Sequence, residues 1–270
     1  MNGDVRNIGK WEDINRNRDF MKCLDIDDES FESDQDKKMP FPPLGKEAKG
    51  KTIEIESDFG NAVLHKSYAE LLDIRRSERI YDANMPLTQS QLAFLLWSAQ
   101  GVQQVVGDNY ASLRPAASGG ARHAFETYIV VRNVEGLVPG IYHYLPLEHV
   151  GEKRVAVELL GSFPDNRELL SDMLVGQKWA EAASVVLFLS CVAYRTEWRY
   201  SSFAHRVSLI DFGHVGQNLM LSASAMGLGS CCVAAYDQAL CDQTLGLDGY
   251  EEYTVYAFVA GNPKRRENAR

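Results

Sequence analysis

The sequence predicts one α+β domain, and three stretches of the chain carry that prediction. Residues 184–192 form an unbroken apolar run, which is typical of a fully buried central strand. Residues 126–144 contain a β-branched and aromatic strand, a turn from Gly136 to Gly140, and a short antiparallel return strand. Residues 205–226 have the spacing of a long helix with apolar groups nearly all round it, so most of its faces must be covered. No internal repeat or linker separates these stretches.

The other elements follow from caps and turn residues. Ser67 caps a helix that leads into an arginine-rich run, and Thr88-Gln-Ser-Gln91 is a capping-box pattern that opens a second, buried helix ending at Gly101. Asn166 caps a third helix. Further short elements are expected as strands at 155–160, 231–235 and 253–260 and as a helix at 237–245.

Composition and charge exclude several classes of function. The chain has 270 residues and a formal net charge of −9, whereas a protein that binds nucleic acid needs a basic face. No apolar run approaches the roughly 20 residues that span a bilayer, and the start lacks a signal-peptide core, so we expect no membrane partner. Five cysteines without disulfide spacing favour a reducing, cytoplasmic location. The six histidines are scattered, so we expect no metal.

Residues 1–50 differ from the body, which we assign to residues 51–270. The stretch 24–37 is crowded with acids, and Met39-Pro-Phe-Pro-Pro43 can be neither helix nor central strand. We interpret this segment as an extended arm that lies over the body or over a partner subunit. A disordered, solvated tail is the alternative. The apolar residues that favour docking are Trp11, Phe20, Met21 and Phe41.

The run Arg75-Arg76-Ser77-Glu78-Arg79 is the strongest candidate for chemistry. Its three guanidinium groups and one hydroxyl suit phosphate oxygens. The alternative is a basic helix end, where cations face the negative pole of the helix dipole. Ser118-Gly-Gly120 follows a loop and lacks the Gly-x-Gly-x-x-Gly spacing of a dinucleotide fold, so side chains must hold any phosphate.

Several phrases in order resemble the FMN-binding signature of the nitroreductase superfamily, and more closely its SagB-like branch, which includes azoline dehydrogenases of peptide biosynthesis. Besides the arginine run and Gly227-Leu-Gly229, the matching phrases are Leu96-Trp97, Arg114-x-x-x-Ser118-Gly-Gly-Ala-Arg-His123, Glu126-x-Tyr128, Gly136-Leu-x-Pro-Gly-Ile-Tyr-x-Tyr144, Gly213-His-x-x-Gln-Asn218 and Ala260-Gly-x-Pro263. The resemblance covers residues 65–263. It implies a three-layer fold with a mostly antiparallel central sheet flanked by helices, and a homodimer that holds FMN at its subunit interface.

The resemblance also implies roles for single residues. The phosphate, ribityl and pyrimidine side of FMN would be held by Arg75, Ser77 and Arg79, with Arg76 beside them at the cofactor. The isoalloxazine would be lined by Ser118 and Gly119 from the other subunit, although Ala117 replaces the proline that commonly precedes this serine. The ribityl or O2 edge would be reached by Gln177 and Lys178, and the ring would lie beside Cys232, Val233 and Ala234. Lys264 or Arg265 would be a C-terminal cation on the phosphate.

One departure from the family pattern bears on the reaction. The azoline dehydrogenases carry a Lys-Tyr pair where this chain has Arg199-Tyr200. Arginine stays protonated, so removal of a substrate proton would fall to Tyr200. The leading hypothesis is an FMN-dependent oxidoreductase that moves hydride from NAD(P)H through flavin N5 to a nitroaromatic, quinone or similar acceptor. The alternatives are a SagB-like azoline dehydrogenase, with Arg199 orienting the peptide, and a flavin-binding module without turnover.

Overall fold

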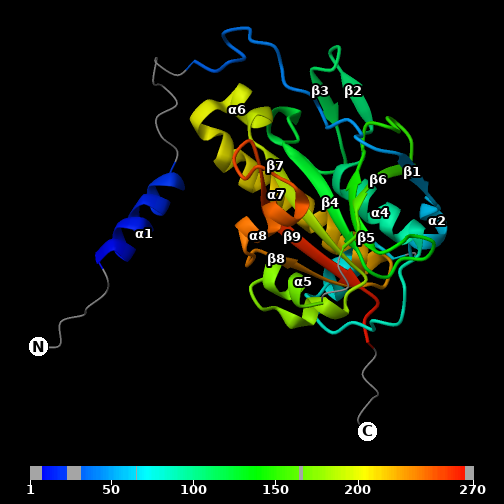
Figure 1. Cartoon of the computed structure of the whole chain (residues 1–270). Coiled ribbons are helices and arrows are strands. Elements are labelled where there is room, and N and C mark those ends of the chain that lie inside the picture. The colour runs from blue at the N-terminus through cyan, green and yellow to red at the C-terminus, as the bar shows by residue number, and fades with distance from the viewer. Residues whose placement is uncertain (1–7, 23–31, 65, 164–166, 265–270) are drawn as a thin grey trace, which may run out of the picture.

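The body of the protein is built on a seven-stranded sheet in which every pairing is antiparallel. The computed structural model describes residues 8–22, 32–64, 66–163 and 167–264 (Figure 1). In sheet order the strands are β1 (Thr52–Ile55), β6 (Val155–Gly161), β5 (Gly140–Tyr144), β4 (Phe125–Val131), β7 (Val185–Val192), β9 (Glu252–Gly261) and β8 (Gly229–Val233). A separate hairpin joins β2 (Gln104–Val106) to β3 (Ala111–Leu113). The predicted α+β class and mostly antiparallel sheet are confirmed.

The predicted central strand is β7, which pairs with β4 on one side and β9 on the other. Residues 185–191 are all buried, because both faces of the sheet are covered at this strand. The predicted strand–turn–strand unit is β4 and β5, which pair in antiparallel register.

Helices cover the sheet in two layers. The helices are α1 (Ile8–Phe20), α2 (Phe59–Ala62), α3 (Tyr68–Ile74), α4 (Gln89–Gln100), α5 (Arg167–Met173), α6 (Tyr194–Tyr200), α7 (Ala204–Ala225) and α8 (Gln238–Leu245). On one face α4 and α7 pack against β-strand residues such as Ile129 and Leu187. On the other face α5 and α8 pack against Val130, Val186 and Phe188. The three-layer arrangement is visible in Figure 1.

The predicted helix starts are found where caps were expected. Ser67 and Thr88 each accept a hydrogen bond from the backbone three residues on, and both capping boxes are complete. Asp237 caps α8 in the same way. The expected cap at Asn166 lies outside the described residues. Thus local sequence sets these helix boundaries.

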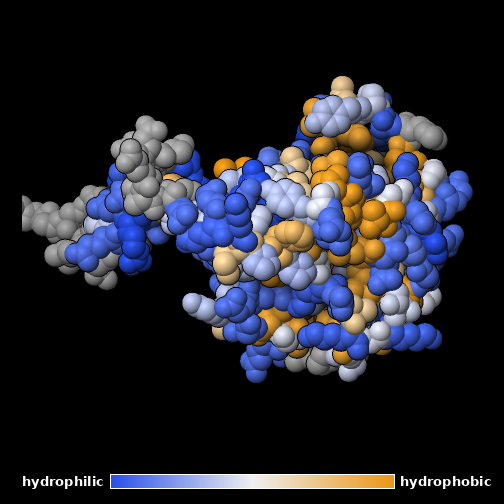
Figure 2. All heavy atoms as spheres, turned by 90° about the horizontal axis from the view of Figure 1, so that it is seen from above, coloured by the Kyte–Doolittle hydropathy of each residue, from blue (hydrophilic) through white to orange (hydrophobic). Residues whose placement is uncertain are grey.

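The N-terminal segment has two described parts. Residues 8–20 form α1, a helix that the sequence analysis did not predict; its side chains are mostly exposed, and its surface in Figure 2 is largely hydrophilic. Residues 33–50, which we call the strap, lie on the body. The Gln35 amide donates to the Trp198 carbonyl at 2.9 Å, and Trp198 Nε1 donates to the Met39 carbonyl at 3.0 Å.

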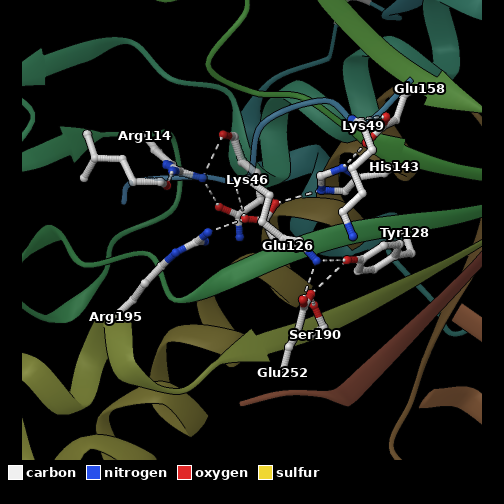
Figure 3. A network of polar contacts seen from close by, with 12 residues as sticks. Lys46, Lys49, Arg114, Glu126, Tyr128, His143, Glu158, Ser190, Arg195 and Glu252 are labelled. Atoms are coloured by element: carbon white, nitrogen blue, oxygen red, sulfur yellow. Dashed lines mark hydrogen bonds and ion pairs between the residues drawn. The ribbon is translucent and has the colours of Figure 1, made fainter. Parts of the chain in front are cut away.

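A buried polar network fixes the end of the strap to the sheet (Figure 3). The Lys46 amide donates to Glu126 Oε1 at 3.0 Å. The amides of Lys49 and Gly50 donate to Glu158 Oε2 at 2.7 and 2.9 Å. Lys46 Nζ reaches Tyr128 and forms an ion pair with Glu252. The strap therefore contacts polar side chains of β4, β6 and β9 directly.

Glu126 is the central charge of this network. Its Oε1 accepts from Arg195, and its Oε2 lies 2.9 Å from His143 Nε2. His143 Nδ1 lies 3.1 Å from Glu158 Oε1, so each ring nitrogen faces a carboxylate. Burial raises the pKa of Glu126, but Arg195 and His143 outweigh burial and hold that pKa at about 2.

The Glu126→Gln variant tests how much this buried charge contributes. The folded-state pKa of about 2 lies below the unfolded value of about 4.3. The carboxylate therefore stabilises the fold above pH ~4.3, and this contribution is lost as the pH falls towards 2. We expect the variant to lose about 3 kcal/mol of unfolding free energy at neutral pH and to show a flatter pH dependence in acid.

Urea unfolding at a series of pH values measures both effects. The Glu54→Gln variant is the control, because Glu54 pairs with His149 and Arg154 while 49% exposed. Equal losses in the two variants would contradict a special contribution from Glu126.

Candidate functional site

The arginine run lies along the β8 edge of the sheet. α3 ends at Ile74 and Arg75 is its C-cap. Ser77 then pairs with Ser230 of β8, and the Glu78 amide donates to the Ser230 carbonyl at 2.8 Å. The first two arginines therefore lie at the negative end of the helix dipole, and the run from Ser77 onward is extended beside the sheet.

The side chains of the run have different partners. Arg76 Nη1 donates to the carbonyls of Asp73 and Arg75 at 2.6 and 2.8 Å, so this arginine satisfies the helix end. The Arg79 guanidinium lies 5.7 Å from the centre of the Trp179 ring. Arg79 is exposed, as is Ser77. The two interpretations of the run thus divide between its residues: Arg76 caps the helix, and Arg79 is open to a ligand.

The C-terminal cation is brought to the same place. The Lys264 amide donates to the Ile80 carbonyl at 3.0 Å, and Tyr81 pairs with Pro263. Lys264 is exposed, and this backbone pairing places it beside Ile80, the residue after the arginine run. Arg265, its alternative, lies outside the described residues.

Gln177 and Lys178 lie beside the end of β8. Gln177 Nε2 donates to the Leu174 and Ala235 carbonyls at 3.0 and 3.1 Å. Lys178 opens a short 3₁₀ turn, is exposed, and precedes the Trp179 ring that faces Arg79. These residues and the segment Cys232–Ala234 thus share one neighbourhood with the arginine run.

The two adjacent cysteines of β8 are free thiols within this neighbourhood. Burial raises the pKa of Cys231, while Arg79 and a hydrogen bond from Ser77 oppose the rise. Burial also raises the pKa of Cys232 to about 11. Protonated thiols in a strand are poor nucleophiles, so their contribution here is packing.

A second neighbourhood forms where α6 meets the Ser118 loop. A Cβ on Gly119 would lie 2.4 Å from Val207 Cγ1. A Cβ on Gly120 would lie 2.6 Å from Arg199 Nε and 2.9 Å from Tyr200 Oη. Gly120 also has a φ of 58°, which favours glycine. The two glycines therefore let Arg199 and Tyr200 lie directly on this loop within one subunit.

Asp211 of α7 holds the loop, and the sequence analysis missed it. Ser118 Oγ donates to Asp211 Oδ2 at 2.7 Å, and the Gly119 amide donates to both carboxylate oxygens at 3.1 and 3.0 Å. The His123 amide donates to Ser118 Oγ at 3.0 Å. Burial raises the pKa of Asp211, and the hydrogen bonds from Ser118 and Gly119 oppose it. The Ser118 hydroxyl and the Gly119 amide thus donate their hydrogen bonds within the subunit.

Backbone strain gathers at the same place. Ala121, His123 and Ser201 have φ values of 53°, 45° and 46°, in the left-handed region that favours glycine. Such residues cost about 1–3 kcal/mol each and persist where surrounding contacts over-determine them. Asp211 supplies such contacts on the loop side.

α7 separates the two neighbourhoods and touches both. Asp211 binds the Ser118 loop, and Cys232 Sγ donates to the Gly216 carbonyl at 3.7 Å.

Among the described residues, no group of histidines, cysteines and acids could hold a metal ion. No helix in the described ranges is long and apolar enough to cross a membrane.

The sheet order, the flanking helices and the motifs in order define one class of protein. A family model described as the nitroreductase family matches residues 72–262. The chain therefore belongs to the nitroreductase family, a family of oxidoreductases, and the resemblance stated from its motifs is confirmed.

The chain is similar in sequence to two curated relatives. It is 32% identical over 167 residues to a Methanocaldococcus jannaschii protein named as a nitroreductase, and the match covers 62% of this chain and 78% of that one. It is 29% identical over 153 residues to the trifolitoxin-processing protein TfxB of Rhizobium leguminosarum, which covers 56% of this chain but 39% of TfxB. The TfxB likeness is consistent with the SagB-like branch.

Solved structures agree on the fold. A nitroreductase structure from Anabaena variabilis has a TM-score of 0.59 at 24% identity and covers 82% of this chain and 45% of that one. The E. coli microcin synthetase McbBCD complex has a TM-score of 0.57 at 22% identity and covers 75% of each chain.

The Asp211→Asn variant tests how the Ser118 loop is held. An Asn oxygen at the Oδ2 position can still accept from Ser118 Oγ and the Gly119 amide, but its NH2 group would then replace Oδ1, which lies 3.1 Å from the Gly119 nitrogen. The bond from the Gly119 amide therefore loses its charge assistance and faces a second donor, which removes most of its strength. We expect the Gly119 amide to exchange its hydrogen about tenfold faster, as for a lost hydrogen bond of about 1.4 kcal/mol. Hydrogen exchange followed by NMR measures this, with β7 amides as the internal control. Unchanged exchange at Gly119 would show that Asp211 does not hold the loop.

Proposed function

We propose that this protein is an FMN-dependent oxidoreductase that passes hydride from NAD(P)H to a small electrophilic acceptor, such as a nitroaromatic or a quinone. One observation carries the proposal. Arg79, Gln177 and the segment Cys232–Ala234 come from three separate parts of the sequence and meet along β8 and the residues that follow it.

The residues present fit a phosphate-bearing flavin. In the described part of the chain, neither Arg75 nor Arg79 has an ion pair with a carboxylate. These guanidinium groups lie next to the exposed Ser77 and have no ion-pair partner among the described residues, so they are free to bind a phosphate. A phosphate accepts several charge-assisted hydrogen bonds. Lys264, whose amide bonds to the Ile80 carbonyl, adds a further positive charge close to the arginine run.

Once bound, FMN would supply a ring that accepts and donates hydride at N5. The chain would contribute the binding and the electrostatics. Arg79 and Lys178 would be the donors that favour negative charge on the N1–O2 edge, whereas both N–H groups of Gln177 are engaged by the Leu174 and Ala235 carbonyls. The thiol of Cys232 would stay protonated beside the ring, because burial raises its pKa to about 11.

We further propose that a second copy of the chain completes the site. The sequence predicts that α7 is covered on most faces, yet Leu209 and Ile210 are 52% and 55% exposed. Leu72 of α3 is 48% exposed as well. Apolar side chains in this number are costly to leave in water and favour a self-complementary interface. A homodimer would bring the Ser118 loop of one subunit towards the β8 neighbourhood of the other.

Azoline dehydrogenation of a peptide is the second candidate. The observation that favours it is the position of Tyr200, whose hydroxyl would lie 2.9 Å from a Cβ on Gly120 in the loop proposed to line the flavin. The likeness to TfxB, named as a toxin-processing protein, and to a chain of the microcin synthetase complex also supports a peptide substrate. In this reaction Tyr200 would take the proton, since Arg199 stays protonated.

Flavin spectroscopy distinguishes these functions. We expect yellow protein whose released cofactor has the mass of FMN. NADH or NADPH should bleach the flavin within seconds, and a quinone should restore its colour. Colourless protein that takes up no FMN would overturn the proposal. Bleaching by an azoline peptide and not by NAD(P)H would establish the second candidate, and failure of every acceptor to restore the colour would leave a flavin-binding module.

Two single variants test the cofactor contacts. The Arg79→Ala variant should retain less than a tenth of the wild-type FMN, because a charged hydrogen bond to phosphate is worth about 1.5–3 kcal/mol. The Arg76→Ala variant is the matched control, since Arg76 donates to backbone carbonyls and should keep its FMN. Flavin content per folded chain is read from absorbance, with circular dichroism confirming the fold. Equal flavin content in Arg79→Ala and wild type would show that the arginine run does not hold the cofactor.

A further inference from the structure

Arg199 is a cation without a carboxylate partner beside Tyr200. Among the residues that the structure describes, it forms no ion pair, and its Nη1 donates to the neutral Tyr110 hydroxyl at 2.8 Å. The pKa of Asp36 is lowered mainly by hydrogen bonds from Ser33 and to a smaller extent by the charge of Arg199. That carboxylate is held instead by Ser33, whose Oγ and amide donate to Asp36 Oδ2 at 2.6 and 3.0 Å.

Tyr110 holds this guanidinium from a rigid position. Its hydroxyl also accepts from Gln35 Nε2 of the strap at 3.1 Å. Its carbonyl accepts from Arg122 Nη1, and its ring meets Phe41 and Trp198 edge-on with centres 6.0 Å apart in both cases. The strap, the hairpin loop, α6 and the Ser118 loop thus all meet at this one residue.

Arg199 is confined on its other side by Gly120. A Cβ on that glycine would lie 2.6 Å from both Cδ and Nε of Arg199, so the side chain lies flat on the loop. Its Nη1 donates to Tyr110 and its Nε lies against Gly120, and within the described residues no further hydrogen bond engages the guanidinium.

We propose that Arg199, held in place by Tyr110, binds a carboxylate on the acceptor molecule and so selects acidic substrates. Arginine offers a planar fork that can donate two parallel hydrogen bonds to a carboxylate, which the lysine found at this position in related dehydrogenases cannot do. Tyr110 is a positioning residue in this scheme, because it acts through Arg199. The reaction step rests on the proposed reductase function, whereas the binding step does not.

Two matched probes test the proposal. 4-Nitrobenzoate and 4-nitrobenzamide have the same shape and the same nitro group, but only the benzoate carries a charge. We expect wild-type protein to bind and reduce the benzoate at least tenfold better, as for a hydrogen bond between two charged groups. Arg199→Gln should abolish the preference. Tyr110→Phe keeps the ring contacts and removes the hydroxyl, so it should reduce the preference to about threefold with unchanged flavin content.

The control variant is Tyr194→Phe. Tyr194 is on the same helix, and its hydroxyl donates to Asp34 of the strap at 3.0 Å. This change loosens the strap without touching Arg199, so the preference for the benzoate should survive. Loss of the preference in Tyr194→Phe would overturn a specific positioning by Tyr110.

The binding measurement separates this proposal from the proposed function. Quenching of tryptophan fluorescence by the two nitro compounds reports affinity whether or not the protein reduces them. If the protein holds no flavin, the reductase proposal fails, and a benzoate preference that Arg199→Gln removes still supports the carboxylate site. Equal affinities of the wild type for the two probes, or a preference that persists in Arg199→Gln, would overturn it.

Discussion

The buried Glu126 carboxylate is the interaction on which the placement of the site depends. It lies on β4 and binds Arg195, the second residue of α6. The Arg195 carbonyl accepts from Arg122 Nε at 3.1 Å, which ties the Ser118 loop to the same helix. Both bonds fix the start of the helix whose end carries Tyr200. Removing one charge from such a cluster leaves the others buried without a partner, so the cluster tolerates little displacement.

The Ser118 loop shows how the chain uses that fixed frame. Two glycines let α6 come within van der Waals distance, and left-handed residues such as His123 bend the loop into place. Neither feature is stable by itself, because strained backbone relaxes unless other contacts hold it. Asp211 provides those contacts from α7, and its own burial is offset by the donors of Ser118 and Gly119. α6, the Ser118 loop and the Asp211 carboxylate therefore hold one another in place.

The parts of the fold that rest on local pattern were predictable from sequence. The apolar run of β7, the N-cap at Ser67 and the capping box at Thr88 depend on neighbours within a few residues, and each was placed correctly. The partners of the candidate site were not, because they pair across the chain: Asp211 bonds to Ser118 over 93 residues, and Tyr110 to Arg199 over 89. The signal for Asp211 was a charged residue within an apolar helix, which must have a partner when buried.

Positions of unpaired positive charge are informative in this chain because acids are in excess. It has 37 acidic residues against 28 lysines and arginines, so a surface arginine will commonly meet a carboxylate. Within the described residues Arg195 has an ion pair, and Arg76, Arg114 and Arg122 donate to backbone carbonyls. In the same part of the chain, no ion pair or carbonyl bond is formed by the side chains of Arg75, Arg79 and Arg199. A guanidinium left without an acid in such surroundings costs electrostatic energy unless an anion arrives. The first two lie near β8 and the third lies beside Tyr200, which agrees with the proposals that Arg75 and Arg79 bind the cofactor phosphate and that Arg199 binds a substrate carboxylate.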